Sequence, residues 1–562
     1  MCGIVGFNWN DKQLLKKMSD TIIHRGPDQF GYFEDKGISL GHRRLSIIDL
    51  SEKAKQPMFN EDNSIVLVYN GEIYNFKELR KELQKKGHKF NSETDSEVVL
   101  HAYEEYGENC VLKFNGMFAF AIWDSKNQKL FLARDRSGIK PLYYWYKDGK
   151  MIFASEIKSI LEDKEVKRII NSNSLGQFLE RKTVFGNETF FKDIKKLLPG
   201  QTLILQKKEI ILKNFYSLNF TNNEDNLNFN KEFDNVIKDM LVSDVPLGVF
   251  LSGGLDSSLV TAFMAKHTKN LNTFTVGFDL STDEFKFAKK VAEKFSTNHH
   301  ELNISFKDMT NVLDKIVWHM DEPIADPAII PTFIMSKFAK KKVSVCLIGE
   351  GSDELFAGYS KYKLSKLLPK QVYFAISDVV FNNREKKKLL KKDYYQPTSK
   401  SFIKPYFKIK NKICAAMAFD FKEVMPNYQL MKIDKMTMAN SLEARVPFLD
   451  NRIISIGEKM KNECKFKKDQ GKYFLRELSK KMLPPSFAKD KKRSFYTPLK
   501  DWFNNEIIER ACSDLESSEL FNKKAINKLT HLNKTSIRRY KYSNQLWTLY
   551  LIEKWYRKYI LN

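Results

Sequence analysis

The stretch from Val245 to Met264 limits the possible folds more than any other part of the chain. Its first part, Val245 to Leu251, is mostly apolar and predicts a short buried strand, and the apolar run from Leu259 to Met264 predicts a helix. Between them, the turn Ser252-Gly253-Gly254 has no bulky side chain. A strand, a glycine turn and a helix start direct free backbone N–H groups and the helix dipole at one point, which suits an anion such as phosphate. A glycine turn without a ligand is the alternative, and the spacing of a Walker P-loop is absent.

Further strand and helix patterns follow this turn in alternation. Apolar runs at 274–278 and 343–348 and the start of a strand at 299–302 predict further strands, and residues 284–295 have the apolar face of a helix. Alternating strands and helices predict a parallel sheet with right-handed crossovers, and such sheets bind ligands beyond the carboxyl ends of their strands. The adjacent histidines of 299–302 would point to opposite faces of a strand, so they do not predict a shared metal site.

Four charged residues near the predicted ligand edge are candidates for chemistry. Asp256, beside the first glycine turn, could hold a hydrated Mg²⁺ ion. Glu350 has glycine on both sides, which allows a close approach to a substrate, whereas Asp353 has a plausible alternative as a helix cap. Lys472 could stabilise a phosphorus centre from which pyrophosphate departs, or it could be an ordinary solvated lysine.

The composition places the chain among soluble proteins of more than one domain. At 562 residues it is too long for one core, and two or three domains are expected. No apolar run approaches the roughly 20 residues of a membrane helix, and the N-terminus lacks the pattern of a secretory signal. The six cysteines include no C-x-x-C pair, so they suggest neither a disulfide framework nor a zinc site. A reducing, cytoplasmic location without membrane partners is therefore predicted.

The net charge of +25 raises the question of nucleic-acid binding. The basic clusters at 340–342, 385–392 and 489–493 are scattered, and none lies in an RNA- or DNA-binding motif. A lysine-rich surface that favours solubility is the simpler interpretation, and no nucleic-acid partner is predicted.

The amino-terminal part contains the residue types that hydrolysis of a glutamine amide requires. Removal of Met1 would leave Cys2 with a free α-amine, which can act as the base for its own thiol. The reaction also needs oxyanion donors, a cation for the substrate carboxylate and an anion for its ammonium group. The candidates for these roles are Arg44, Asn70, Gly71, Glu72 and Asp95. Each of them could instead be a turn residue or an ion-pair partner.

Together with the motifs at 24–28, 116–123, 133–136, 140–143 and 153–156, these residues resemble the class II glutamine amidotransferase domain, an N-terminal-nucleophile hydrolase. The resemblance covers Cys2 to about Leu205 and implies an α+β fold, the αββα sandwich. It also implies Cys2 as the nucleophile and Asn70 with Gly71 as the oxyanion hole. The glutamine-binding residues that it implies are Arg44, Leu45, Ser46, Ile47, Ile48, Asn70, Gly71, Glu72 and Asp95.

The string SGGLDSS resembles the PP-loop of ATP pyrophosphatases, which cleave ATP to AMP and pyrophosphate. The order Cys2, NGE, SGGLDSS, GEGSDE and LEARVPFLD resembles that of glutamine-hydrolysing asparagine synthetases of the class B type. This resemblance implies a glutaminase domain at 2–205, a linker at 206–230, and a synthetase domain at 231–562. The synthetase domain is expected to be an α/β parallel-sheet PP-loop domain with a largely helical C-terminal part.

In that family, aspartate attacks the α-phosphate of ATP to give β-aspartyl-AMP and pyrophosphate with Mg²⁺, and ammonia from glutamine passes through an internal tunnel to give asparagine. The resemblance implies Asp256 and Asp353 as Mg²⁺ ligands, Glu350 as the residue that supports the intermediate and accepts a proton from ammonia, and Lys472 as the residue that stabilises adenylation. The implied ATP-binding residues are Leu251, Ser252, Gly253, Gly254, Leu255, Asp256, Ser257, Val276, Ile348 and Gly349. Relatives usually have Ser or Thr where Ile348 stands.

Two other functions remain open from the sequence. The first is a relative that amidates another carboxylate, such as a sugar acid or a peptide side chain, and the second is a basic scaffold without enzymatic activity. The acceptor pocket, expected near 321–326 and 443–450, would separate the first from an asparagine synthetase. The resemblance also implies a homodimer whose partners are the small molecules glutamine, aspartate and ATP.

Overall fold

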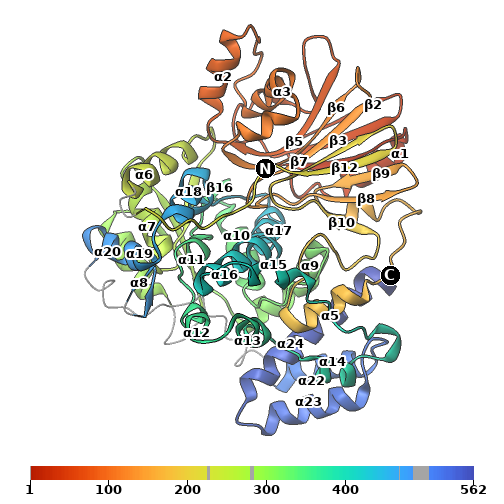
Figure 1. The fold of residues 1–562 in the computed structure, drawn as a ribbon, viewed down its shortest axis with the longest axis vertical. Coiled ribbons are helices and arrows are strands. Elements are labelled where there is room, and N and C mark those ends of the chain that lie inside the picture. The colour runs from red at the N-terminus through yellow and green to blue at the C-terminus, as the bar shows by residue number, and fades with distance from the viewer. Residues whose placement is uncertain (1, 225–227, 279–283, 468, 485–504, 562) are drawn as a thin grey trace.

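The computed structural model describes residues 2–224, 228–278, 284–467, 469–484 and 505–561. Figure 1 shows two antiparallel sheets at the upper right, a parallel sheet with its helices at the left, and a group of helices at the bottom. The basic cluster at 489–493 and the Met1 position lie outside the described residues.

The amino-terminal domain consists of two stacked six-stranded antiparallel sheets. The first sheet has the order β10 (Ile194–Lys196), β8 (Tyr143–Lys147), β9 (Lys150–Ala154), β1 (Gly3–Phe7), β3 (Ile38–Arg44) and β2 (Gln29–Asp35). The second has the order β12 (Glu209–Asn214), β11 (Gln201–Gln206), β7 (Lys129–Arg134), β6 (Gly116–Asp124), β5 (Ile65–Ile73) and β4 (Met58–Phe59).

Helices cover the outer faces of both sheets. Helices α1 (Lys12–Asp20) and α4 (Ile157–Ile160) pack on the first sheet, and α3 (Asp95–Tyr106), with α2 (Phe76–Lys85) beside it, packs on the second. Strand β5 shows why the strands are apolar throughout. Val66 and Val68 point into the layer between the sheets, whereas Leu67 and Tyr69 point into a second core on the opposite face of the sheet. The predicted αββα sandwich is confirmed by this arrangement.

The first domain extends into the segment that was expected to be a linker. Strand β12 pairs along its whole length with β11, which in turn pairs with β7, so residues 209–214 belong to the second sheet. After it, the chain runs along the second domain, where the Thr221 N–H donates to the Glu458 carbonyl over 3.0 Å. Residues 225–227 of the expected linker lie outside the described residues.

The second domain contains the predicted parallel sheet. Its strands have the order β15 (Asn298–Asn303), β14 (Asn272–Gly277), β13 (Leu247–Phe250), β16 (Val345–Leu347) and β17 (Glu443–Arg445), and all neighbours are parallel. From β13 the chain winds outward to β14 and β15 and then returns to the other side of β13 through β16. Beyond the carboxyl ends of β13 and β16 lies the crevice where sheets of this kind bind ligands.

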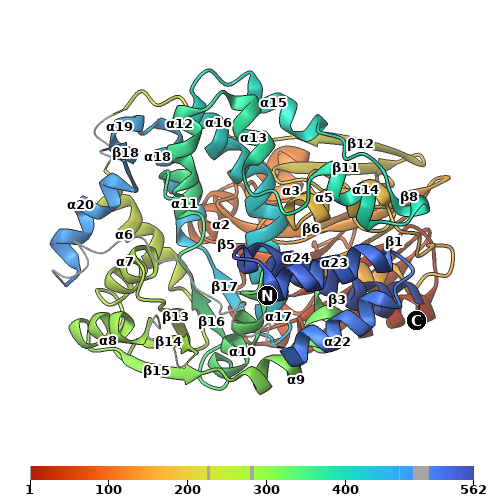
Figure 2. The same ribbon diagram turned by 90° about the horizontal axis from the view of Figure 1, so that it is seen from below.

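The rest of the second domain is largely helical, as the resemblance implied. No helix in the ranges given above has the length and apolar character needed to cross a membrane. Helices α22, α23 and α24 pack against one another, and Figure 2 shows them side by side. Outside the two sheet layers, the described residues form the α-helices α5 (Ser172–Arg181), α6 (Phe229–Met240), α7 (Leu255–Met264), α8 (Phe285–Lys294), α9 (Phe306–Met320), α10 (Ile329–Ala339), α11 (Ser352–Leu355), α12 (Lys361–Leu367), α13 (Lys370–Ile376), α14 (Asn383–Leu389), α15 (Lys404–Phe407), α16 (Lys412–Phe419), α17 (Leu430–Met438), α18 (Asn451–Lys459), α19 (Asn462–Lys465), α20 (Tyr473–Met482), α22 (Asn505–Glu516), α23 (Lys523–Thr535) and α24 (Arg539–Tyr556).

Candidate active sites

Cys2 is buried at the start of β1, with only 8% of its surface exposed. Its backbone N–H donates to Asn70 Oδ1 over 3.0 Å, which ties the first residues of the chain to β5. Burial raises the pKa of the Cys2 thiol, although the positive N-terminus and Arg44 act in the opposite direction. A thiol with a raised pKa needs a base close by to become a nucleophile at neutral pH.

Asn70 and Gly71 lie beside Cys2 on β5, as the sequence predicts. Asn70 Nδ2 is buried and has no hydrogen-bond partner among the described residues, so the amide that accepts from the Cys2 N–H keeps a free donor. A Cβ atom at Gly71 would lie 2.2 Å from the Met117 carbonyl oxygen of β6, which leaves no room for a side chain. The role of these two residues as oxyanion donors stays a prediction.

Arg44 holds the loop that follows β3. Its guanidinium donates to Gln29 Oε1 over 2.7 Å and to the carbonyls of Ile48, Asp49 and Ser51. Much of its donor capacity is thus used within the protein, and its predicted contact with the substrate carboxylate remains a prediction. The loop carries the other predicted glutamine contacts Leu45, Ser46, Ile47 and Ile48, all of which are buried except the half-buried Ser46.

The two predicted anions, Glu72 and Asp95, are also close to this site but have different partners. Asp95 Oδ2 accepts hydrogen bonds from the Tyr69 hydroxyl over 2.7 Å and from the Ile73 N–H over 2.8 Å. Glu72 Oε1 lies 3.2 Å from an Nη of Arg445, which belongs to the second domain. Burial raises the pKa of both carboxyls, and Arg445 partly offsets this for Glu72.

Strand β17 connects this site with the second one, a link that the sequence analysis missed. Arg445, 0% exposed, bonds Glu443 Oε1 over 2.6 Å besides pairing with Glu72. Its backbone pairs with Leu347 of β16, and its carbonyl accepts from the Ile348 N–H over 3.0 Å. A single short strand therefore contacts the surroundings of Cys2 with its side chains and the ligand edge of the parallel sheet with its backbone.

A second link between the domains is a buried ionic cluster. Arg25 donates to the Cys2 carbonyl over 3.1 Å, to Glu156 over 2.9 Å and to Asp434 over 2.8 Å. Asp434 belongs to α17, whose next residue, Lys435, pairs with Asp321 over 2.6 Å. Burial acts against the charge on Arg25, but the two carboxylates outweigh it and raise its pKa. The cluster fixes the start of the chain against the second domain.

The glycine turn after β13 has the predicted form. Ser252 Oγ lies 3.1 Å from Ser257 Oγ, and the Gly254 N–H donates to Ser252 Oγ over 3.3 Å. The N-cap residue of α7 is Gly254, so no capping side chain bonds the first N–H groups of the helix. An anion could therefore bind at this helix start. At Gly349, a Cβ atom would lie 2.9 Å from the Asp256 Cβ, so glycine is needed for the two loops to approach each other.

Lys472 joins the two predicted metal ligands. Its Nζ lies 2.5 Å from Asp256 Oδ2 and 2.9 Å from Asp353 Oδ1, and Asp256 also accepts from Ser352 Oγ over 2.8 Å. Burial acts to lower the pKa of Lys472, but the two carboxylates outweigh it and raise it. The two carboxylates lie in the first turns of α7 and α11, beside an anion-binding turn, and such a donor set suits Mg²⁺ bound together with phosphates.

The glycine turn and the starts of α7 and α11 border a cavity of about 620 Å³ at the carboxyl edge of the parallel sheet. Lys432 of α17 pairs with Asp326 over 2.9 Å at its wall, and burial raises the pKa of Glu350, which lies there too. Lys432 was not among the residues predicted from the sequence. The predicted ATP-binding and metal residues on the wall are Leu251, Ser252, Gly253, Gly254, Leu255, Asp256, Ser257, Val276, Ile348, Gly349 and Asp353, with Glu350 and Lys472.

The expected position of the acceptor pocket stays a prediction, because only one residue of the two expected segments lines the cavity. Of residues 321–326 and 443–450, only Asp326 lines the cavity. Asp321 belongs to the ionic cluster between the domains, while Glu443 and Arg445 face the Cys2 site. Asp321, Glu443 and Arg445 are charged and lie close to the parallel sheet, but their side chains pair at the interface between the domains instead of lining the cavity.

A buried thiol in an αββα domain and an anion-binding turn on a parallel sheet define a glutamine-dependent amidotransferase with a nucleotide-binding domain. The profile of the family described as "Glutamine amidotransferase domain" matches residues 1–216, and that of "Asparagine synthase" matches residues 228–557. The second match spans more than half of the chain, which therefore belongs to the asparagine synthase family.

Curated relatives agree with this assignment. The chain is 37% identical to asparagine synthetase [glutamine-hydrolyzing] 1 of Bacillus subtilis, over 92% of this chain and 90% of that protein. It is 33% identical to the asparagine synthetase of Brassica oleracea, over 84% of this chain and 72% of that one. Among solved structures, the glutamine phosphoribosylpyrophosphate amidotransferase of B. subtilis is 16% identical, with a TM-score of 0.30, over 53% of this chain and 65% of that one.

Proposed function

We propose that this chain is a glutamine-hydrolysing asparagine synthetase, which converts ATP, aspartate, glutamine and water into AMP, pyrophosphate, asparagine and glutamate. The observation that carries this proposal is the pair of linked sites. A buried Cys2 lies beside the free Nδ2 donor of Asn70, and β17 runs from there to the cavity that Asp256, Asp353 and Lys472 line. Its relatives are named for the same reaction.

In the first half-reaction, the Cys2 thiolate attacks the glutamine carboxamide. Asn70 Nδ2 and the Gly71 N–H stabilise the oxyanion, ammonia leaves, and water hydrolyses the thioester to glutamate. With Met1 removed, the Cys2 amine would be the base, and its hydrogen bond to Asn70 Oδ1 would orient it toward the thiol. Arg44 and the loop at 45–48, together with Glu72 and Asp95, would bind the glutamine.

In the second half-reaction, the aspartate side-chain carboxylate attacks the α-phosphorus of ATP and pyrophosphate leaves. The turn at 252–257 would bind the pyrophosphate, and Leu251, Val276, Ile348 and Gly349 would contact the adenylate. Lys472 stabilises the charge that develops on the phosphate oxygens. Asp256 and Asp353 would hold Mg²⁺, which when bound offsets phosphate charge. Ammonia then attacks the side-chain carbonyl of β-aspartyl-AMP and displaces AMP, and Glu350, whose pKa burial raises, accepts a proton from the attacking nitrogen.

The Lys432–Asp326 pair favours an amino acid as the acceptor. The two side chains lie 2.9 Å apart at the cavity wall and carry one charge of each sign. An α-carboxylate could pair with Lys432 and an α-ammonium with Asp326, whereas a sugar acid has no ammonium group for the second contact. We therefore expect aspartate to be a much better acceptor than succinate, which has the same side-chain carboxylate but no ammonium.

The experiment is an assay of AMP release with ammonium chloride and a panel of carboxylates. The proposal predicts strong release with aspartate, weak release with succinate and none with sugar acids. Absence of release with aspartate, in a preparation that still hydrolyses glutamine, would contradict it and favour another acceptor. We also propose that the enzyme is a cytoplasmic homodimer, and the absence of disulfides among its six cysteines fits a reducing compartment.

A further inference from the structure

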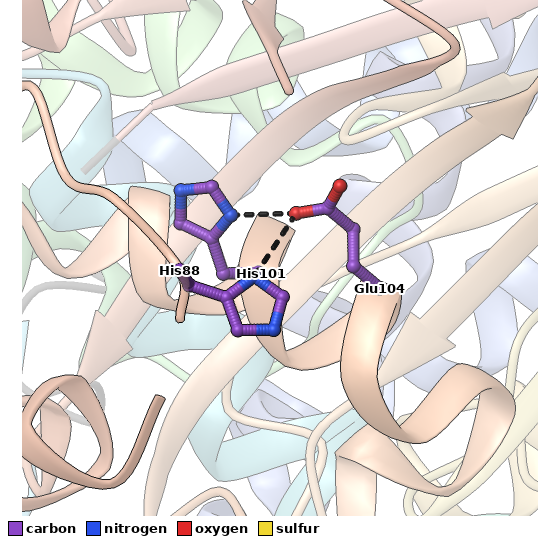
Figure 3. A group of neighbouring side chains, drawn as sticks. All are labelled: His88, His101 and Glu104. Atoms are coloured by element: carbon purple, nitrogen blue, oxygen red, sulfur yellow. Dashed lines mark hydrogen bonds and ion pairs between the residues drawn. The ribbon is translucent and has the colours of Figure 1, made fainter. Parts of the chain in front are cut away.

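Two histidines and a glutamate that take no part in the reactions described above form a cluster beside helix α3. His88 is in the segment between α2 and α3, and His101 and Glu104 are on α3, three residues apart and therefore on one face. Figure 3 shows that both rings turn a nitrogen toward the same carboxylate. His88 Nδ1 lies 3.6 Å from Glu104 Oε2, and His101 Nδ1 lies 2.6 Å from the same oxygen.

The other polar atom of each of these side chains faces a partner of its own. His88 Nε2 lies 3.2 Å from Glu105 Oε2, and His101 Nε2 faces Glu97 Oε1 at 3.8 Å. Glu104 Oε1 accepts from Asn60 Nδ2 over 2.8 Å. In metal sites, a carboxylate on the far nitrogen orients the imidazole and makes it a better ligand. All three side chains thus present one ligand atom to a common point while neighbours hold the other.

The spacing of these three atoms suits a small divalent ion. Zinc–ligand bonds of about 2.0–2.1 Å in a tetrahedral arrangement place neighbouring ligand atoms roughly 3.3 Å apart. The three atoms all lie within 4.8 Å of one another, so shifts of less than about an ångström would complete the geometry. Side chains of His88 and Glu104 are 15% and 17% exposed, which leaves a water-accessible fourth position, and Glu104 also borders a cavity of about 550 Å³ through which an ion could enter.

We propose that His88, His101 and Glu104 form a structural binding site for Zn²⁺ or a similar divalent transition metal. The ion would fasten the segment after α2 to α3. Helix α3 begins at Asp95, which accepts from Tyr69 and Ile73 beside the Cys2 site, so the ion would stabilise the helix that positions this carboxylate. The proposal stands on the cluster itself and does not depend on the reaction proposed above.

The test uses the full-length chain without a histidine tag, stripped with a chelator and dialysed. Titration with ZnCl₂ against a colorimetric chelator should show one tight equivalent per chain, with a rise in the thermal midpoint. His88→Ala should weaken binding at least tenfold and abolish the thermal shift, and Glu105→Gln, which removes only the charge behind His88, should weaken binding by about tenfold. His531→Ala, an exposed histidine on α23, should bind zinc like the wild type.

Two results would overturn the proposal. If the wild type takes up no tight equivalent, the cluster is an ion pair of His101 and Glu104 only. If His88→Ala and Glu105→Gln both bind zinc as tightly as the wild type, the ion lies elsewhere. Cobalt gives a second readout, because the visible absorption of tetrahedral Co²⁺ should form in the wild type and in His531→Ala but not in His88→Ala.

Discussion

Replacing Lys472 with methionine tests the electrostatics of the ATP cavity. Methionine keeps most of the length of lysine but removes the ammonium that bonds Asp256 and Asp353 at 2.5 and 2.9 Å. Lys472 is only 5% exposed, so water cannot fully replace its charge. The loss of one preorganised charge of this kind costs about 3–4 kcal/mol of transition-state stabilisation, or roughly 10²–10³ in rate. Because the two carboxylates raise its pKa, Lys472 stays charged at working pH, and the loss should not depend on pH in that range.

The assay is the aspartate-dependent exchange of labelled pyrophosphate into ATP, with glutamate release from glutamine measured in parallel. We expect exchange to fall by about 10²–10³ while glutamate release stays within a factor of two or so of the wild type. The matched control is Lys480→Met on the same helix, since its side chain is 49% exposed and pairs only with Glu477 in the described structure. Exchange within tenfold of the wild type, or an equal loss of glutamate release, would refute the reasoning.

Three further predictions concern other parts of the molecule. Gly71→Ala should abolish glutamate release but leave ammonium-dependent synthesis, because its Cβ would lie 2.2 Å from the Met117 carbonyl oxygen; equal loss of both activities would contradict this. Arg25→Met should lower the free energy of unfolding by about 3–5 kcal/mol, since it takes the Arg25 charge away from two buried carboxylates, and chemical denaturation should show this against the control Arg80→Met, whose partner Glu93 is exposed. Burial raises the pKa of Glu354 to about 8, whereas the unfolded carboxyl ionises near its usual pKa of about 4.3. The free energy of unfolding should therefore fall by about 1.4 kcal/mol for each unit of pKa difference as the pH rises from about 5 to 8. Thermal melts at several pH values should show a smaller fall for Glu354→Gln, and the same pH dependence in both proteins would contradict this.

The features that could be predicted from the sequence are local ones. The apolar runs at 274–278 and 343–348 and the glycine turn at 252–254 carry their own signals, because strand, turn and helix start are set by neighbouring residues. The same holds for the residues of the ATP cavity, which lie at the ends of two predicted strands. The αββα domain came from the resemblance of several motifs and is borne out by the two sheets.

The contacts between the domains could not be predicted from the sequence. Arg25 and Asp434 are 409 residues apart, and no local pattern links them. Strand β17 is only three residues long, and two of its residues, Glu443 and Arg445, are charged, which is equally typical of a polar loop. Lys432 lies on a helix whose buried face contains charged residues, because they pair with groups from other elements.

The most direct test of the central claim follows the nitrogen atom from glutamine to asparagine. Wild-type enzyme is supplied with amide-¹⁵N glutamine, aspartate, ATP and an equal amount of unlabelled ammonium, and the label in asparagine is measured by mass spectrometry. If ammonia made at the buried Cys2 reaches the cavity inside the protein, nearly all early asparagine carries ¹⁵N, while Cys2→Ala makes only unlabelled asparagine. If the label in wild-type asparagine merely matches the labelled share of ammonia in solution, the two sites exchange through the solvent and the account is wrong.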